Sequence, residues 1–159
     1  MTAANPFGHP RWGLQFHWWA VDPAGRVGLF YSAFGPVPTA ARRHAPALDR
    51  ATAAARARHP EWFDTVCHAD FEDCPVTHCV VRLGHAPYLF TWDEEFDDRY
   101  TRFGVPSRPV HLAELPEELA RAALLVPVGF PLSDAVRVDL AYPDGRERLS
   151  ATASDGGPR

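Results

Sequence analysis

The sequence predicts a single α+β domain whose sheet is mostly antiparallel and built from hairpins. Aromatic and β-branched residues flank turn motifs over residues 14–33, 76–92 and 136–149, which is typical of paired strands. Two further stretches, residues 39–58 and 116–125, have helical spacing instead. The chain has 159 residues, of which 46% are hydrophobic and 23% charged, so it is long enough to form one domain with its own core.

The first hairpin, residues 14–33, is the best-defined element. Its turn, Asp-Pro-Ala-Gly at residues 22–25, has the chemistry of a type I turn followed by a left-handed glycine. This turn places Trp18 opposite Phe30, and Trp19 then belongs to the other face. We expect a covering layer on both faces, because both are largely apolar.

Helices are predicted to pack on this sheet. Pro46 divides residues 39–58 into two pieces, because proline is tolerated only in the first turn of a helix. Pro116 begins residues 116–125 in the same way, with carboxylates following it at the positive end of the helix dipole. The core-facing side of the first stretch is expected to carry Leu48, Ala51 and Ala55, and its outer side arginines.

The remaining strands are predicted from local patterns. Residues 84–87 form the loop of the hairpin over 76–92, and a turn is expected at residues 105–107. Residues 136–149 form a last hairpin, because an alternating strand is followed by a proline, spacer and glycine turn.

The ends of the chain lack periodic patterns. We expect residues 1–12 to form a flexible arm, residues 13–149 the domain, and residues 150–159 a disordered tail.

The composition gives few clues to function. The chain has no lysine or isoleucine, and all 16 basic residues are arginine, which indicates the coding bias of a high-GC bacterial genome. The arginines are therefore not a sign of phosphate or carboxylate recognition. Three cysteines, and the lack of a signal segment or a long apolar run, predict a cytoplasmic protein with no membrane association.

Charge is distributed unevenly along the chain. Residues 60–98 contain ten acidic residues and one arginine, a net charge of −9, whereas residues 1–59 contain seven arginines and two acids. Carboxylates beside aromatic side chains combine long-range attraction with apolar contact area, which suits a complex with a basic protein partner. The predicted partner-binding residues are Trp92, Asp93, Glu94, Glu95, Phe96, Asp97, Asp98 and Tyr100. A plain solvated loop and a hard-cation site are the alternatives, and the run lacks the turn glycine of a calcium loop.

Two other groups of residues are candidates for chemistry. Gln15, His17 and Tyr31 share the less apolar face of the first hairpin, where they either line a ligand pocket or satisfy each other at a half-buried edge. The second group, with the chemistry of zinc ligands, is Cys67, His68, Cys74, His78 and Cys79. The spacing of its cysteines favours structural residues over a zinc site.

The sequence contains no phosphate-binding glycine loop, dinucleotide fingerprint or nucleophile elbow. We therefore expect no cofactor and no catalytic residue, and a pI near 6.0 argues against nucleic acid as a partner. This profile of a compact acidic protein is similar to that of the small immunity proteins that neutralise bacterial toxins, although no motif is shared. The predicted function is non-catalytic binding of a protein partner. The alternative is a small-molecule-binding or enzymatic domain with its pocket over His17 and Tyr31.

Overall fold

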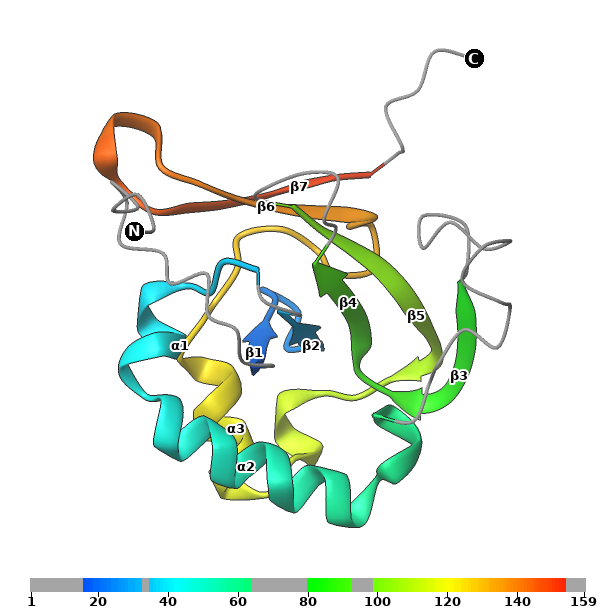
Figure 1. Ribbon diagram of the computed structural model, residues 1–159. Helices are drawn as coiled ribbons and strands as arrows, with labels where there is room; N and C mark the ends of the chain where they lie inside the picture. The colour runs from blue at the N-terminus through cyan, green and yellow to red at the C-terminus, as the bar shows by residue number, and fades with distance from the viewer. Residues whose placement is uncertain (1–15, 33–34, 64–79, 93–98, 154–159) are drawn as a thin grey trace, which may run out of the picture.

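The computed structural model describes residues 16–32, 35–63, 80–92 and 99–153. These residues form a curled, mixed sheet of seven strands with three α-helices, an α+β fold (Figure 1). The strands are β1 (His17–Val21), β2 (Val27–Tyr31), β3 (Val81–Ala86), β4 (Tyr88–Trp92), β5 (Arg99–Pro109), β6 (Arg137–Ala141) and β7 (Arg148–Thr152). The helices are α1 (Thr39–Arg43), α2 (Ala45–Arg58) and α3 (Glu117–Leu124), and the short 3-10 helices are η1 (Pro60–Trp62), η2 (Leu112–Glu114) and η3 (Pro143–Gly145).

The sheet follows the order β1-β2-β4-β5-β6-β7, and β3 pairs with β5. Strands β1 and β2 are antiparallel, and Trp18 lies opposite Phe30 as the turn predicts. The pairs β2–β4 and β3–β5 are parallel, whereas the other four pairs of the described strands are antiparallel, so the sheet is mixed but mostly antiparallel. In Figure 1 the β6–β7 hairpin crosses the top of the molecule, and α2 lies at the opposite side.

The predicted hairpin over residues 76–92 is wrong. Strand β3 pairs with β5, whereas β4 pairs with β2 and β5. Only Pro87 separates β3 from β4, and a tight hairpin needs a loop of at least two residues. Gly84 and His85, which the sequence suggested for that loop, belong to β3. Residues 76–79 lie outside the described residues.

The turn expected at residues 105–107 is also wrong, because β5 runs without interruption from Arg99 to Pro109. Its first half pairs with β4 and β6, and its second half pairs with β3. Pro106 and Pro109 lie in the second half, where the strand has one neighbour among the described residues. Proline is tolerated in such edge positions because it need not donate a hydrogen bond there.

Helices α2 and α3 pack against β1, and α1 packs against α2. The first helical stretch is divided at His44, and Pro46 lies in the first turn of α2, as its missing N–H predicts. Helix α3 follows Pro116 directly. Leu48, Ala51 and Ala55 of α2 are buried against the sheet and α3.

Aromatic rings from four strands form the centre of the core. Trp18 stacks on Phe30 at a centroid distance of 3.9 Å, and Phe30 stacks on Phe90 at 4.5 Å. Tyr100 meets the edge of Trp18 at 5.3 Å. On the opposite face the indole of Trp19 donates a hydrogen bond of 3.1 Å to Thr52 on α2. The first hairpin is therefore covered on both sides.

The β6–β7 hairpin extends to Thr152, beyond the predicted end of the domain at residue 149. Its turn is tied to α1, because Glu147 accepts hydrogen bonds from the backbone and hydroxyl of Thr39 and from the hydroxyl of Tyr142. The predicted arm, residues 1–12, and residues 154–159 lie outside the described residues. In the described part of the chain no helix is both long and apolar enough to cross a bilayer.

The buried carboxylate of Asp22 fixes the turn of the first hairpin. It accepts hydrogen bonds from the backbone N–H groups of Ala24, Arg26 and Leu132 at 2.9 to 3.0 Å, and from Arg26 Nε at 2.8 Å. Gly25 takes the left-handed conformation that the turn requires, with φ of 83°. Asp22 thus joins the turn to residue 132, which is 110 positions away in the sequence.

Substitution Asp22→Asn is expected to lower the free energy of unfolding by about 2 to 4 kcal/mol, because the amide removes the charge and turns an N–H group toward backbone donors. Urea denaturation followed by tryptophan fluorescence measures the loss. The exposed control Asp49→Asn should change stability by less than about 0.5 kcal/mol. Equal effects of the two substitutions would contradict the role of Asp22.

Candidate functional site

The acid-rich segment connects β4 to β5. Trp92, the last residue of β4, lies opposite Tyr100 near the start of β5. Residues 93–98, which include Asp93, Glu94, Glu95, Phe96, Asp97 and Asp98, lie outside the described residues. Trp92 is half-buried and packs so closely on Gly35 that the indole leaves no room for a Cβ at that position. The indole is therefore held in place at the base of the segment.

Tyr100 is not part of a binding surface, contrary to the sequence prediction. Its side chain is completely buried, and its hydroxyl accepts a hydrogen bond from Trp18 Nε1 at 3.2 Å and donates one to the carbonyl of Pro36. Burial raises the pKa of the Tyr100 phenol well above its ordinary value, an effect larger than the opposing effect of the Trp18 hydrogen bond. The residue is a neutral part of the core.

His17 and Tyr31 do contact each other, at a ring distance of 4.8 Å, and a third ring packs against His17. Phe63 meets His17 edge-on at 5.4 Å, and the Arg56 guanidinium lies 4.9 Å from the centre of the Phe63 ring. Burial lowers the pKa of His17 to about 4, with a smaller contribution from the charge of Arg56. The imidazole is therefore neutral near pH 7. Gln15, the third member of this candidate pocket, lies outside the described residues.

The cysteine and histidine group, Cys67, His68, Cys74, His78 and Cys79, also lies outside the described residues. Elsewhere in the chain, the described residues contain no group of three or more histidine, aspartate or glutamate side chains that could hold a metal ion.

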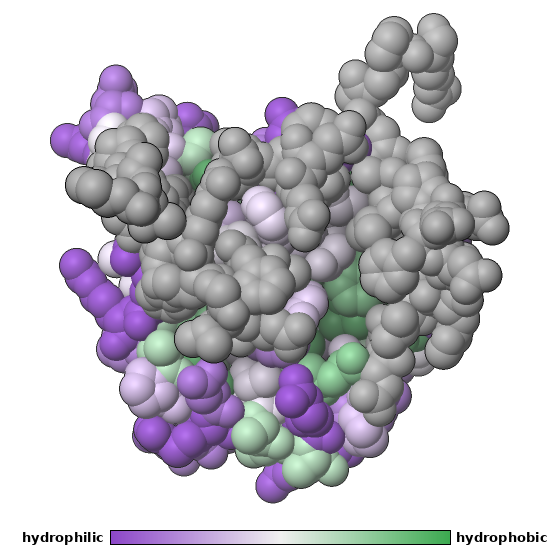
Figure 2. Space-filling model, viewed as in Figure 1, coloured by the Kyte–Doolittle hydropathy of each residue, from purple (hydrophilic) through white to green (hydrophobic). Residues whose placement is uncertain are grey.

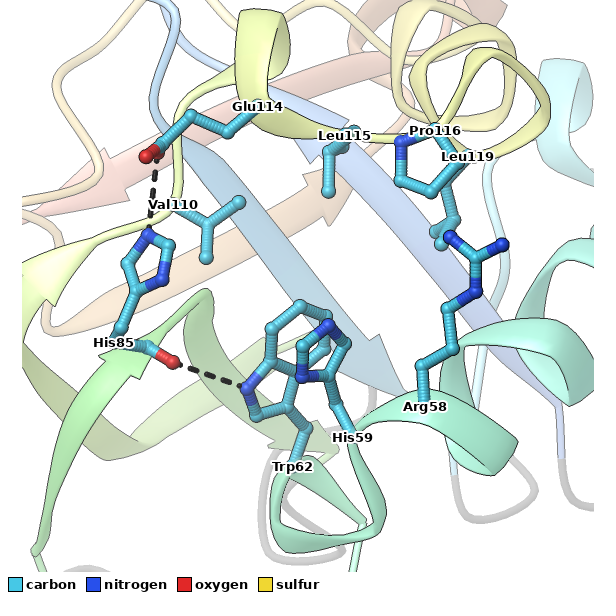
Figure 3. Close-up of a pocket in the computed structure, with 9 residues that line it drawn as sticks. All are labelled: Arg58, His59, Trp62, His85, Val110, Glu114, Leu115, Pro116 and Leu119. Atoms are coloured by element: carbon cyan, nitrogen blue, oxygen red, sulfur yellow. Dashed lines mark hydrogen bonds and ion pairs between the residues drawn. The ribbon is translucent and has the colours of Figure 1, made fainter.

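A small pocket that the sequence did not suggest lies where the end of α2 meets β3 and the start of α3 (Figure 3). Its polar lining consists of Arg58, His59, His85 and Glu114. Its apolar lining includes Trp62, Val110, Leu115 and Leu119. The cavity volume is about 50 Å³, which is room for a few water molecules or one small chemical group.

Two aromatic rings form one wall of this pocket. His59 stacks on Trp62 at a centroid distance of 4.0 Å with nearly parallel rings. Trp62 is buried, and its Nε1 donates a hydrogen bond of 3.2 Å to the backbone carbonyl of His85. His59 Nδ1 lies 3.3 Å from a carboxylate oxygen of Glu61. Strand β3 and the segment after α2 are thus held together by this wall.

The opposite rim is a histidine–carboxylate contact held by the backbone. His85 Nε2 lies 3.2 Å from Glu114 Oε2, and the same oxygen accepts a 2.8 Å hydrogen bond from the backbone N–H of His111. That backbone hydrogen bond is the main reason why the pKa of Glu114 is lowered, and the His85 side chain adds to it. Glu114 is therefore ionised at neutral pH and already has two partners.

No local signal in the sequence points to this pocket. Its residues come from three separate stretches of the sequence, 58–62, 85 and 110–119. His59 ends a helix and Trp62 is buried in the core, so neither residue type signals a pocket. Only the pairing of β3 with β5 brings His85 to Glu114, and that pairing was not predicted.

Comparison of the chain with protein families, with curated proteins and with solved structures finds no match.

The outer surface of α1 and α2 is basic. Hydrophilic side chains lie along α1 and α2 in Figure 2, between paler and green patches. The exposed arginines of these helices are Arg43, Arg50, Arg56 and Arg58.

The pH dependence of folding is expected to reveal the buried neutral His17. Below its ordinary pKa of 6.5 the unfolded chain binds a proton at His17 that the folded protein does not bind until about pH 4. Stability should therefore fall as the pH falls through this window. Between about pH 7 and about pH 5, the free energy of unfolding of the wild type should fall by roughly 1 to 2 kcal/mol more than that of the His17→Phe variant.

Urea denaturation at the two pH values measures this difference. The exposed His44 serves as the control, because His44→Phe should retain the wild-type pH dependence. If the free energy of unfolding falls equally for the wild type and for His17→Phe between the two pH values, His17 is not buried in its neutral form.

Proposed function

We propose that this protein binds a basic protein partner through the acidic connection between β4 and β5, without catalysing a reaction. The observation that carries the proposal is the concentration of charge at that connection. Five of the six residues 93–98 are acidic, within a stretch of net charge −9. Charge of one sign on a surface accelerates association with an oppositely charged partner.

The described residues support this proposal by fixing both ends of the connection. Trp92 packs on Gly35, and Tyr100 is locked in the core by Trp18 and Pro36. The connection therefore begins and ends on rigid strands. A binding segment held in this way loses less conformational freedom when the complex forms.

The proposed binding residues are Trp92, Asp93, Glu94, Glu95, Phe96, Asp97 and Asp98. Trp92 supplies a rigid, partly exposed aromatic surface beside the carboxylates, a residue type enriched at interface hot spots. Tyr100 is left out because it is buried. A partner of matching chemistry has a basic surface, as nucleases and other toxins that act on nucleic acids do. We propose on this ground an immunity-like protein of the bacterial cytoplasm.

The alternative function, a small-molecule-binding or enzymatic domain over His17 and Tyr31, has less support. Phe63 packs edge-on against His17, and burial keeps the His17 imidazole neutral near pH 7. Binding of a small molecule that shifts the NMR signals of both residues would restore this alternative.

Neutralising part of the acidic connection should weaken partner binding. A tagged triple variant, Asp93→Asn, Glu94→Gln and Asp97→Asn, is expected to bind a partner captured by the wild type at least about tenfold less tightly, mainly through slower association. The association rate of the wild type should also fall steeply between about 0.05 M and about 0.5 M salt. Surface plasmon resonance with the purified partner measures both effects.

A matched control carries the same change in net charge at exposed acids elsewhere, namely Asp49→Asn, Glu118→Gln and Asp144→Asn. This control should bind the partner like the wild type. If the two triple variants bind equally well, the acidic connection is only a solvated loop and the proposal is wrong.

A further inference from the structure

We propose that the pocket between α2, β3 and α3 binds a carboxylate group carried on a short apolar stem, with Arg58 as its principal partner. This site is separate from the acidic connection and does not depend on the function proposed for it. The inference rests on the cation at one side of the pocket, the apolar surface beside it and the rigidity of the surrounding residues (Figure 3).

The guanidinium of Arg58 is the cation that remains available in this pocket. Within the described part of the chain Arg58 has no hydrogen bond or ion pair, although it lines the cavity. The neighbouring Arg56 differs, because its guanidinium lies over the ring of Phe63. A guanidinium presents its N–H groups in a plane that matches the two oxygens of a carboxylate.

His59 forms the wall of the pocket beside Arg58. Its Nδ1 lies 3.3 Å from a carboxylate oxygen of Glu61, which can only accept, so Nδ1 is the ring nitrogen that donates there. The ring cannot turn away easily, because it is stacked on Trp62. The N–H groups for an anion at this wall therefore come from Arg58, and His59 fixes the shape of the wall beside it.

The acidic side chains near the pocket already have partners. Glu114 is bound by His85 and by the backbone of His111, and Glu61 faces His59. A cationic ligand would have to displace the existing partners of these carboxylates. An anion would instead pair with the guanidinium of Arg58, which has no ion pair within the described part of the chain. The polar groups therefore favour a carboxylate over an amine.

The apolar lining favours a carboxylate that is attached to a short aliphatic stem. Val110, Leu115 and Leu119 offer aliphatic surface, and Figure 3 shows these side chains between Arg58 and the His85–Glu114 pair. A cavity of about 50 Å³ accommodates a stem of only a few carbon atoms. Propionate has this chemistry, and so does the side chain of a glutamate on another protein.

The walls are fixed before a ligand arrives. Trp62 is held by the carbonyl of His85, and Glu114 is held by His111. A preformed site loses little conformational entropy on binding, which allows measurable affinity for a small ligand. We expect a dissociation constant for propionate of about 1 to 10 mM.

The test is an NMR titration of the full-length ¹⁵N-labelled protein with propionate and with propionamide, its neutral analogue of the same shape. Propionate should shift the backbone signals of Arg58, His59, Trp62 and His85 along saturating curves. Propionamide should bind at least about tenfold more weakly, because it lacks the charge.

Two arginine variants on the same helix provide the control. Arg58→Met keeps the aliphatic part of the side chain and should weaken propionate binding by about tenfold. Arg50→Met removes an exposed arginine two turns earlier and should change the affinity by less than about twofold. If the NMR spectrum of the Arg58→Met variant shows that it is not folded like the wild type, the Arg58→Gln variant is used in its place.

A third ligand distinguishes the two sources of the carboxylate. The blocked peptide acetyl-Gly-Glu-Gly-amide should bind at least about tenfold more tightly than propionate if the natural ligand is a glutamate side chain of a protein. Equal or weaker binding of the peptide indicates a free short-chain acid. The proposal is overturned if propionamide matches propionate, if both arginine variants lose affinity equally, or if neither carboxylate shifts the pocket signals.

Discussion

The stacked aromatic rings of Trp18, Phe30 and Phe90, closed at the edge by Tyr100, are the constraint on which the rest of the structure depends. Each ring comes from a different strand, so the stack joins β1, β2, β4 and β5 through side chains as well as through the backbone. Aromatic pairs of this kind contribute about 0.5 to 1.5 kcal/mol each beyond the burial of their area. The hydroxyl of Tyr100 adds a hydrogen-bonded link from Trp18 to Pro36, which leads into α1. The acidic connection and the helices are therefore positioned by one rigid centre.

The local elements of this fold could be predicted from the sequence, and the long-range pairings could not. Proline and glycine at residues 22–25 define the first hairpin, and Pro46 marks the start of α2, because both effects act within a few residues. Strand β5 was missed because its arginines, glycine and prolines give no strand-like alternation. The parallel pairs β2–β4 and β3–β5 join segments far apart in the sequence, so no turn motif announces them.

The candidate sites show the same limit. Tyr100 follows a run of acids and resembles an exposed anchor, yet its position opposite Trp92 on a covered strand places it in the core. The pocket beside Arg58 depends on the meeting of β3 with the start of α3, which only the sheet topology determines. The result is a molecule with two chemically opposite features on one scaffold: carboxylates at the connection of β4 and β5, and an available guanidinium at the end of α2. The first suits a basic protein surface and the second a small anionic group, so the two proposals can fail independently.

The central claim is that the aromatic core holds the fold, whereas the carboxylates of residues 93–98 are left for binding. The most direct test is the free energy of unfolding, by urea denaturation, of the variant carrying Asp93→Asn, Glu94→Gln and Asp97→Asn. The account predicts stability equal to or slightly above that of the wild type, because like charges close together repel one another. A loss of more than about 1 kcal/mol would contradict the account, because it would mean that these carboxylates are bound within the protein itself.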